Sequence, residues 1–346
     1  MPYRAAMSLR IFLRRRPTLA NSWSNSQMGF KHSEPQRTST ELASPSGPEK
    51  QTIAPDRVGC IRGLTRRGFH RIAFTDWGLE SCGRPTLCVH GLTRNGRDFD
   101  YLAAALAKGG RRVVCPDLPG RGRSEQLRDH SDYVLPQYCG DMTVLIAAIG
   151  SAEIDWVGTS LGGLIGMVLA ALPGSPIRRM VINDIGPYLP WAGLRRLGNN
   201  LDEAPKGFKT IEAAELYLRR VLAPFGELKD EHWRHLTAHS VEWKPERQHF
   251  ETLCDRNIAH AFRNPWHYSV DLWKYWDAIE IPVLVLRGQQ SDLLPENVLA
   301  EMLRRNRHAI ARTVKNCGHA PALIALDQIE VVQKFLAGST GRRNMR

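Results

Sequence analysis

The sequence lacks the features that mark several classes of protein. Its apolar residues, 42% of 346, never run uninterrupted for the roughly 18 positions that a membrane-spanning helix needs. The seven cysteines include no Cys-x-x-Cys pair, which indicates a reducing compartment and no disulfide framework. No glycine-rich phosphate motif follows an early strand, and there is no internal repeat. These absences favour a soluble, cytoplasmic protein that needs no cofactor.

The net charge of +12 lies mostly at the two ends of the chain. Residues 1–57 carry +5 and the last few residues carry +3, which leaves +4 for everything between them. A nucleic-acid-binding protein concentrates basic residues on its folded surface, so we expect no nucleic-acid partner. We predict a disordered basic extension over residues 1–57 and a basic tail over residues 339–346.

The first 33 residues contain six basic side chains and no acidic one, a pattern that resembles a mitochondrial transit peptide. The alternative is a dispensable extension, or translation that starts upstream of the true start codon. The apolar stretch near residues 9–13 is too short to form a firm amphipathic helix, which favours this alternative and a cytoplasmic location.

From about residue 69, apolar runs of strand length alternate with segments of helix length. Several of the runs are rich in Val, Ile and Leu without polar alternation, as in a parallel sheet covered by helices on both faces. The strand candidates are 70–75, 86–89, 112–115, 154–157, 180–183, 283–287 and 311–314. The helix candidates are 98–107, 133–149, 160–172, 295–304 and 327–336. This order predicts an α/β fold with a doubly wound, mostly parallel sheet and functional residues at the carboxyl ends of its strands.

The alternation stops between residues 188 and 276. This block repeats apolar residues at helical spacing and holds six of the nine tryptophans and six of the twelve histidines. We predict that it forms a helical cap, with residues 58–187 and 277–338 as the core. Aromatic residues of the cap, such as Trp191 and Trp266, are candidates for substrate contacts. No histidine pair there is backed by a carboxylate at metal-ligand spacing, so we expect no metal site.

A serine stands between two glycines where an apolar run meets a helix-length segment. The run 154–157 leads into Gly158-x-Ser160-x-Gly162, and the apolar segment 164–172 follows. This spacing predicts a nucleophile elbow, a sharp strand-to-helix turn that exposes the serine hydroxyl. Glycines are needed on both sides because a Cβ there would collide with the tight turn.

Two further reactive residues follow predicted strands. Asp292 comes after 283–287 and His319 after 311–314, so serine, acid and histidine appear in the order typical of hydrolases. A neutral imidazole can take the serine proton, and a carboxylate holds the correct tautomer. We therefore assign Ser160 as nucleophile, His319 as general base and acid, and Asp292 as the orienting carboxylate. Asp184 also follows a strand and is the alternative acid; Asp292 is preferred because its strand lies nearer the end of the chain.

A tetrahedral oxyanion needs preorganised N–H donors. The backbone amide of Leu161, at the start of the predicted helix, is one candidate, and that of Leu92, after His90-Gly91, is the other. His90 and Gly91 are expected to orient this loop.

These motifs, together with the stretch Asp-Leu-Pro-Gly-Arg-Gly-Arg-Ser at residues 117–124, resemble those of the α/β-hydrolase superfamily. The resemblance covers about residues 69 to 338 and implies an α/β-hydrolase fold and catalysis without a cofactor. A serine rather than an aspartate at position 160 is unlike the haloalkane dehalogenases and epoxide hydrolases of this fold.

Three segments, at residues 181–187, 223–226 and 270–273, look like bacterial intracellular esterases often described as 3-hydroxybutyrate-oligomer hydrolases. This likeness implies a serine hydrolase that cleaves carboxylic esters of small to medium, partly apolar substrates through an acyl-enzyme. The chain also resembles enol-lactonases and meta-cleavage-product C–C hydrolases, which use the same triad. A non-catalytic binding protein of this fold is a further alternative, which the presence of every triad residue type disfavours.

Overall fold

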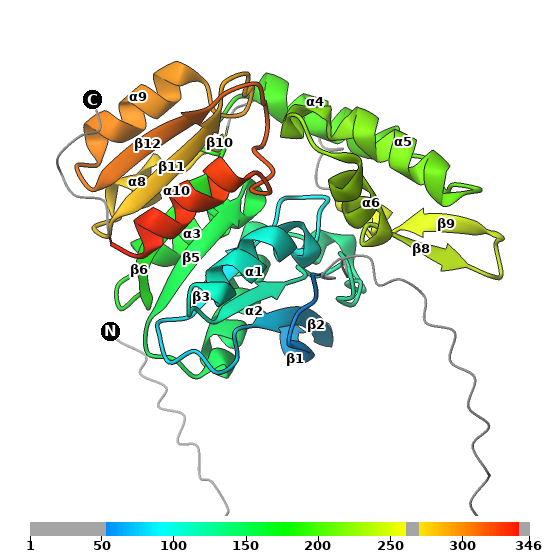
Figure 1. The fold of residues 1–346 in the computed structure, drawn as a ribbon, viewed down its shortest axis with the longest axis horizontal. Helices are drawn as coiled ribbons and strands as arrows, with labels where there is room; N and C mark the ends of the chain where they lie inside the picture. Colours follow the sequence, from blue (N-terminus) through cyan, green and yellow to red (C-terminus); the bar gives the residue numbers. More distant parts are fainter. Residues whose placement is uncertain (1–52, 261–269, 339–346) are drawn as a thin grey trace, which may run out of the picture. The chain divides into compact units, whose positions relative to one another are not determined.

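The computed structural model describes residues 53–260 and 270–338. Its centre is an eight-stranded sheet with the order β1-β2-β4-β3-β5-β6-β11-β12 (Figure 1). β2 runs antiparallel to β1 and β4, and the other neighbouring strands are parallel. The strands are β1 (Arg57–Thr65), β2 (Gly68–Trp77), β3 (Thr86–Val89), β4 (Val113–Pro116), β5 (Ile154–Thr159), β6 (Ile177–Asn183), β11 (Val283–Gly288) and β12 (Ala309–Val314). This is the doubly wound, mostly parallel sheet that the sequence predicts.

Helices cover both faces of the sheet because its central strands are apolar on both sides. Every residue of β3, β4 and β11 is buried. One face packs against apolar side chains of α2, α3 and α9, and the other against α1 and α10, which lie in front of the sheet in Figure 1. The helices are α1 (Asp100–Lys108), α2 (Leu135–Ile149), α3 (Leu161–Ala171), α9 (Glu296–Arg305) and α10 (Leu326–Leu336). Short 3-10 turns are η1 (Gly96–Phe99) and η2 (His130–Asp132).

Strand β1 was not among the predicted strands. It lies at the edge of the sheet, pairs with β2 in a hairpin, and most of its residues are exposed or half-buried. Two glycines and two arginines among its nine positions interrupt the apolar pattern by which a strand is predicted. It begins at Arg57, the last residue of the predicted basic extension. Apart from residues 53–57, that extension lies outside the described residues, as does the tail at 339–346.

Between β6 and β11 the chain leaves the sheet and forms a mixed segment. Its helices are α4 (Trp191–Asp202), α5 (Ile211–Val221), α6 (Asp230–Ala238) and α8 (Trp273–Asp277), with turns η3 (Ala223–Phe225) and η4 (Arg256–Ala259). It also contains the antiparallel hairpin of β8 (Val241–Lys244) and β9 (His249–Thr252), and the short pair β7 (Tyr188–Leu189) and β10 (Val270–Asp271). The segment is helical over much of its length, as predicted, but its two strand pairs were not predicted. Trp243 and Phe250, which are cross-strand partners with ring centroids 5.0 Å apart, stabilise the β8–β9 hairpin.

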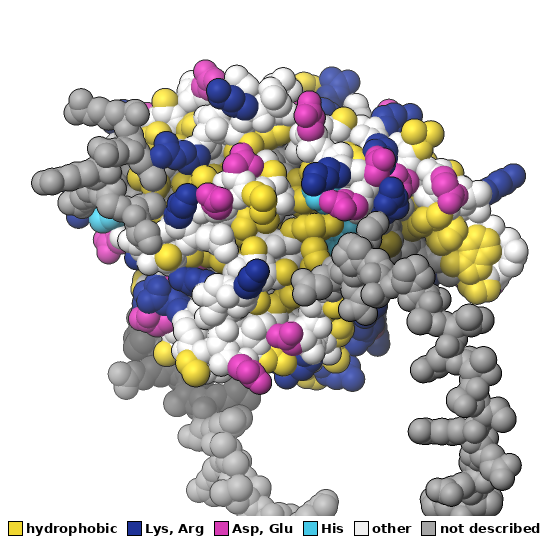
Figure 2. Space-filling model, viewed as in Figure 1, with side chains coloured by type: hydrophobic (Ala, Val, Ile, Leu, Met, Phe, Trp, Pro, Cys, Tyr) yellow, Lys and Arg dark blue, Asp and Glu magenta, His cyan; other side chains and the backbone are white. Residues whose placement is uncertain are grey.

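The α6 helix joins this segment to the core. Trp233 and Leu236 of α6 pack against Ile324, in the loop before α10. We propose that residues 188–276 act as a cap over the sheet, although Trp276 at the end of this range is fully buried in the core cluster. Figure 2 shows apolar side chains in the middle of the displayed face, with acidic and basic side chains mixed around them. No helix in the described part of the chain is long and apolar enough to cross a bilayer.

Candidate active site

The turn between β5 and α3 holds Ser160 in a backbone conformation that L-residues rarely adopt. Its φ and ψ are 50° and −114°, and such strain is typical of functional sites. A Cβ added at Gly158 would lie 2.3 Å from the carbonyl oxygen of Gly162, and one at Gly162 would lie 2.0 Å from that of Val89. Both positions therefore require glycine, and the turn has the geometry that the Gly-x-Ser-x-Gly spacing predicts.

Ser160, His319 and Asp184 form one hydrogen-bonded chain. His319, in the loop after β12, has its Nε2 atom 2.9 Å from Ser160 Oγ. Its Nδ1 atom lies 2.9 Å from Asp184 Oδ2. Because ionised Asp184 can only accept, Nδ1 carries the proton and Nε2 is left to accept the serine hydroxyl. This arrangement can activate a serine oxygen for attack on a carbonyl carbon.

Asp184 is wholly buried and is held by the last residue of β11 and by the loop that follows it. Its Oδ1 accepts a hydrogen bond from the Gly288 amide at 2.7 Å, and its Oδ2 accepts one from Ser291 Oγ at 2.6 Å. Together with His319, three donors satisfy the carboxylate. Buried ions need such partners, because desolvation is otherwise costly.

The assignment of Asp292 as the orienting acid was wrong. Its side chain is 46% exposed and forms a two-pronged ion pair with Arg196 of α4, at 2.5 and 2.8 Å. The β11 loop turns Asp292 towards solvent and supplies Gly288 and Ser291 as donors to Asp184 instead. Asp184 was the alternative considered, and it lies directly beyond the end of β6, the strand between β5 and β11.

His90 orients the peptide whose N–H group is the second predicted oxyanion donor. Its Nδ1 donates to Gly91 O at 2.7 Å, and its Nε2 accepts the Leu118 amide at 2.8 Å. Burial lowers the pKa of His90 to about 3, so the ring is neutral and this tautomer is retained. In a planar trans peptide the N–H points opposite to the C=O, so anchoring Gly91 O fixes the direction of the Leu92 N–H. These hydrogen bonds support the predicted role of His90 in orienting the loop, which stays a prediction.

Neither predicted donor amide has an acceptor among the described residues. Leu161 N heads α3, where the first amides of a helix have no intrahelical partner, and Leu92 N lies in the loop after β3. Both amides are therefore available to a ligand, while their action on an oxyanion stays a prediction.

Comparison with known proteins identifies the family. The family model described as alpha/beta hydrolase fold matches residues 85–325, well over half of the chain. The chain is a member of the α/β-hydrolase family. It is 42% identical over 300 residues to a 3-hydroxybutyrate-oligomer hydrolase of Cupriavidus necator, covering 83% of this chain and 99% of that protein.

Solved structures agree with this assignment. An alpha/beta hydrolase from Novosphingobium aromaticivorans superposes with a TM-score of 0.71 at 31% identity, covering 81% of this chain and 98% of that chain. An esterase of M. tuberculosis has a TM-score of 0.61 at 20% identity, covering 81% of this chain and 92% of that chain, and shares the fold.

In this α/β-hydrolase a buried arginine, which was not predicted, anchors the loop after β3 from the other side. Arg121 is 1% exposed, and its Nε donates to Leu92 O at 2.8 Å. Its Nη1 donates to Pro119 O and to the hydroxyl of Tyr138, at 2.7 and 2.8 Å. The rings of Tyr133 and Tyr138 both lie within 6 Å of the guanidinium carbon. In the sequence, Arg121 is marked only by its place in a glycine-rich stretch, which does not indicate which residues it would contact.

The α/β-hydrolase has a cavity of about 180 Å³ at Ser160 and His319. Its apolar wall comes mainly from α4 and α5, and its polar wall from the loops at residues 90–98 and 252–256. Trp191 is not among the lining residues, and Trp266 lies outside the described residues. The aromatic side chains that line the cavity are Phe99, Tyr217 and Phe225. The predicted substrate contact of Trp191 is therefore not supported.

Although no carboxylate lies at metal-ligand spacing from a cap histidine pair along the chain, the fold brings one to such a pair; the expectation of no metal site stays a prediction. Asp100, His235 and His239 bring ligand atoms within 4.8 Å of one another, which one metal ion could share. His235 and His239 lie one helical turn apart, and Asp100 comes from α1, far away in the chain. However, both carboxylate oxygens of Asp100 already accept hydrogen bonds from Arg97 Nε, at 2.9 and 2.7 Å. The guanidinium neutralises Asp100, so we interpret the group as a polar contact between the α6 segment and the core.

Proposed function

We propose that this α/β-hydrolase is a serine-dependent carboxylic ester hydrolase that works through an acyl-enzyme. The observation that carries the proposal is the hydrogen-bonded chain from Asp184 through His319 to Ser160 Oγ, with 2.9 Å at each step. In this proposal Ser160 is the nucleophile, His319 the general base and acid, and Asp184 the orienting carboxylate.

In the first half of the reaction, His319 Nε2 takes the proton of Ser160 as Oγ attacks the ester carbonyl carbon. The Leu161 and Leu92 amides donate hydrogen bonds to the oxyanion. The tetrahedral intermediate then collapses: the bond to the alcohol oxygen breaks, and His319 returns its proton to the leaving alcohol. Asp184 stabilises the imidazolium that exists between these two events. The acyl group remains bound to Oγ as an ester.

Water completes the cycle. His319 Nε2 takes a proton from a water molecule, whose oxygen attacks the acyl carbon at the same oxyanion donors. Collapse releases the carboxylic acid, and the proton on His319 returns to Ser160 Oγ. Every proton that moves is carried by one imidazole, so no metal or redox cofactor is required by this scheme.

We further propose short oligomers of hydroxyalkanoic acids as the substrate class. The 42% identical relative, nearly all of which is covered, is named for hydrolysis of 3-hydroxybutyrate oligomers. The cavity offers an apolar wall for aliphatic carbons and a polar wall for ester and acid oxygens. Its small volume favours soluble short esters over a polymer surface.

A fluorophosphonate probe tests the nucleophile directly. We expect one covalent adduct on Ser160 in the folded protein, detected by peptide mass spectrometry, and none in Ser160→Ala. Turnover of p-nitrophenyl esters, 3-hydroxybutyrate oligomers and ring-cleavage products should then be measured with both proteins. A folded protein that is not labelled, or one that turns over only the ring-cleavage products, contradicts the ester hydrolase proposal.

A further inference from the structure

Three arginines line the cavity at Ser160, and two of them have their charge cancelled by a carboxylate. Arg94 donates to both oxygens of Asp98, at 2.8 and 2.6 Å. Arg196 does the same to Asp292, at 2.5 and 2.8 Å. These guanidinium groups already have the planar two-pronged contact that arginine forms with carboxylates. They offer little further attraction to an anion.

Arg256 differs, because it has no carboxylate partner among the described residues. Its Nη1 donates to two carbonyl oxygens, of Ala204 at 3.1 Å and Pro205 at 3.0 Å. These bonds hold the guanidinium at the cavity without neutralising it, and no described acceptor contacts its Nε or Nη2. The adjacent Asp255 does not serve as a counter-ion: it is buried and accepts hydrogen bonds from Tyr133 Oη and the Asn257 amide.

The charge of Arg256 acts on the cavity wall. Burial raises the pKa of Tyr217, which lines the cavity, and the nearby positive charges of Arg220 and Arg256 oppose that rise. The two groups are thus close enough to interact electrostatically. Arg256 is exposed to solvent and also lines the cavity, so its unpaired charge attracts an anionic group on a ligand whose apolar part lies against α4 and α5.

We infer that Arg256 forms a carboxylate subsite, and that the enzyme prefers ester substrates that end in a free acid. The inference rests on the proposed ester hydrolase function and deepens it. A hydroxy-acid oligomer carries a carboxylate at one end, a few bonds from its last ester. With that ester at Ser160, the free Nε and Nη2 of Arg256 receive the two carboxylate oxygens, in the fork geometry that lysine cannot reproduce.

A pair of substrates that differ only in the carboxylate tests this subsite: the linear 3-hydroxybutyrate dimer and its methyl ester. We expect the wild-type enzyme to have a kcat/KM about tenfold higher for the free acid. Arg256→Gln should lower kcat/KM for the acid about tenfold more than for the methyl ester, mainly through KM. Arg256→Lys should recover only part of the preference.

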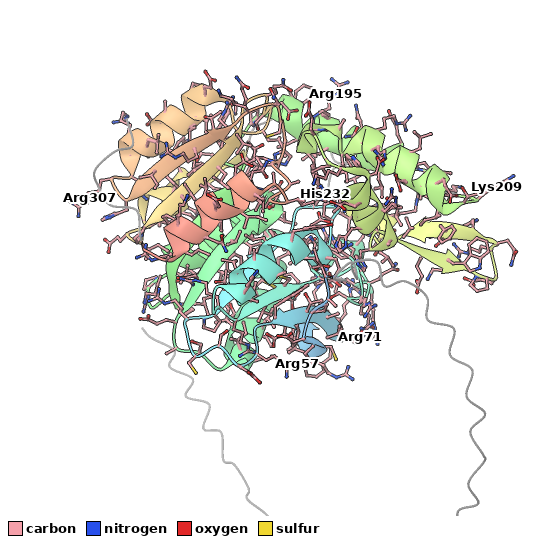
Figure 3. All side chains as sticks on the ribbon, in the orientation of Figure 1. Arg57, Arg71, Arg195, Lys209, His232 and Arg307 are labelled. Carbon is pink, nitrogen blue, oxygen red and sulfur yellow. The ribbon has the colours of Figure 1, made fainter. Side chains whose placement is uncertain are left out.

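The matched control is Arg195→Gln. Arg195 lies on the same helix as Arg196 but is not among the cavity-lining residues, and Figure 3 shows it on the outer side of α4. This variant should keep the wild-type ratio of acid to methyl ester.

The outcomes are distinct. A wild-type enzyme with no preference for the acid, or an Arg256→Gln variant that loses activity equally on both substrates, overturns the subsite. In the second case Arg256 only supports the chain at Ala204 and Pro205. If the wild-type protein hydrolyses neither dimer nor p-nitrophenyl butyrate, the ester hydrolase proposal fails and the subsite fails with it.

Discussion

Asp184→Asn is the substitution that bears most directly on the site. The two side chains have the same shape, but the amide has one acceptor oxygen where the carboxylate has two. Asp184 is fully buried and faces three donors, from Gly288, Ser291 and His319, so no water can compensate. At least one donor must therefore face the amide NH2 group and lose its hydrogen bond.

The rate consequence follows from the imidazole tautomer. If the amide NH2 faces His319, Nδ1 must accept and the proton moves to Nε2, which can then no longer take the proton of Ser160. We expect kcat to fall on the order of 10³- to 10⁴-fold with KM little changed, as for loss of the orienting acid in other serine hydrolases. The assay is steady-state hydrolysis of p-nitrophenyl butyrate, with thermal unfolding to establish that the variant is folded.

Asp292→Asn is the matched control. Asp292 is 46% exposed and paired with Arg196, and exposed ion pairs contribute roughly 0–1 kcal/mol to stability. We expect kcat for this uncharged ester to stay within about twofold of wild type, since neither side chain of the pair takes part in the proton transfers of this mechanism. A larger loss of kcat in Asp292→Asn than in Asp184→Asn would refute the reasoning, as would a folded Asp184→Asn enzyme that retains a tenth of its activity.

Three further predictions concern the framework of the site. Gly162→Ala places a Cβ 2.0 Å from a backbone oxygen of β3 and should destabilise the protein by about 3 kcal/mol or more in urea unfolding; Gly140→Ala, where the added methyl meets nothing, should stabilise it by up to about 1 kcal/mol. For His90 the folded pKa of about 3 lies below the unfolded value near 6.5, so stability is lost as pH falls from 6.5 towards 3. Between pH 7 and pH 5, His90 lowers the free energy of unfolding by about 2 kcal/mol. In His90→Gln the free energy of unfolding should therefore fall by about 2 kcal/mol less over the same pH range. Arg121→Met releases the carbonyl of Leu92 and should lower kcat about tenfold to a hundredfold at unchanged KM, with partial rescue by lysine; a change confined to KM would argue against its role in orienting the loop.

The core of the fold could be predicted because its signals are local. Strand β3 coincides with the predicted run at 86–89, and every one of its residues is buried, so a threonine followed by three apolar residues suffices to mark it. The nucleophile elbow is equally local, since its two glycines and its serine meet within five positions. Strand β1 has no such local signal. Its exposed position at the edge of the sheet does not require apolar residues, and its strand conformation depends on pairing with β2.

Contacts that join distant segments could not be predicted from spacing. Arg121 reaches the carbonyl of Leu92 across 29 positions, and Asp100 meets His235 through packing of α6 on the core. The histidine spacing on α6 was visible in the sequence, but the carboxylate beside it belongs to another helix. The sequence likewise could not show that Arg256 is the cavity arginine without a carboxylate partner. That depends on ion pairs between distant residues, such as Arg196 and Asp292, which are 96 positions apart.

The choice between Asp184 and Asp292 combines a local signal with a long-range contact. The sequence contained the local signal, but the prediction followed the order of the residues along the chain instead. A residue directly after a strand is placed at the catalytic edge by the strand itself. A residue further along depends on the course of its loop, and the loop after β12 brings His319 back to the site. Asp184 is the first residue after β6, whereas Asp292 is four residues beyond the end of β11, which is enough for the loop to turn outward. The end of β11 and its loop supply donors instead of the acid: the Gly288 amide and the Ser291 hydroxyl both donate to the carboxylate of Asp184. The position of Asp184 directly after its strand was therefore evidence in its favour that order along the chain did not provide.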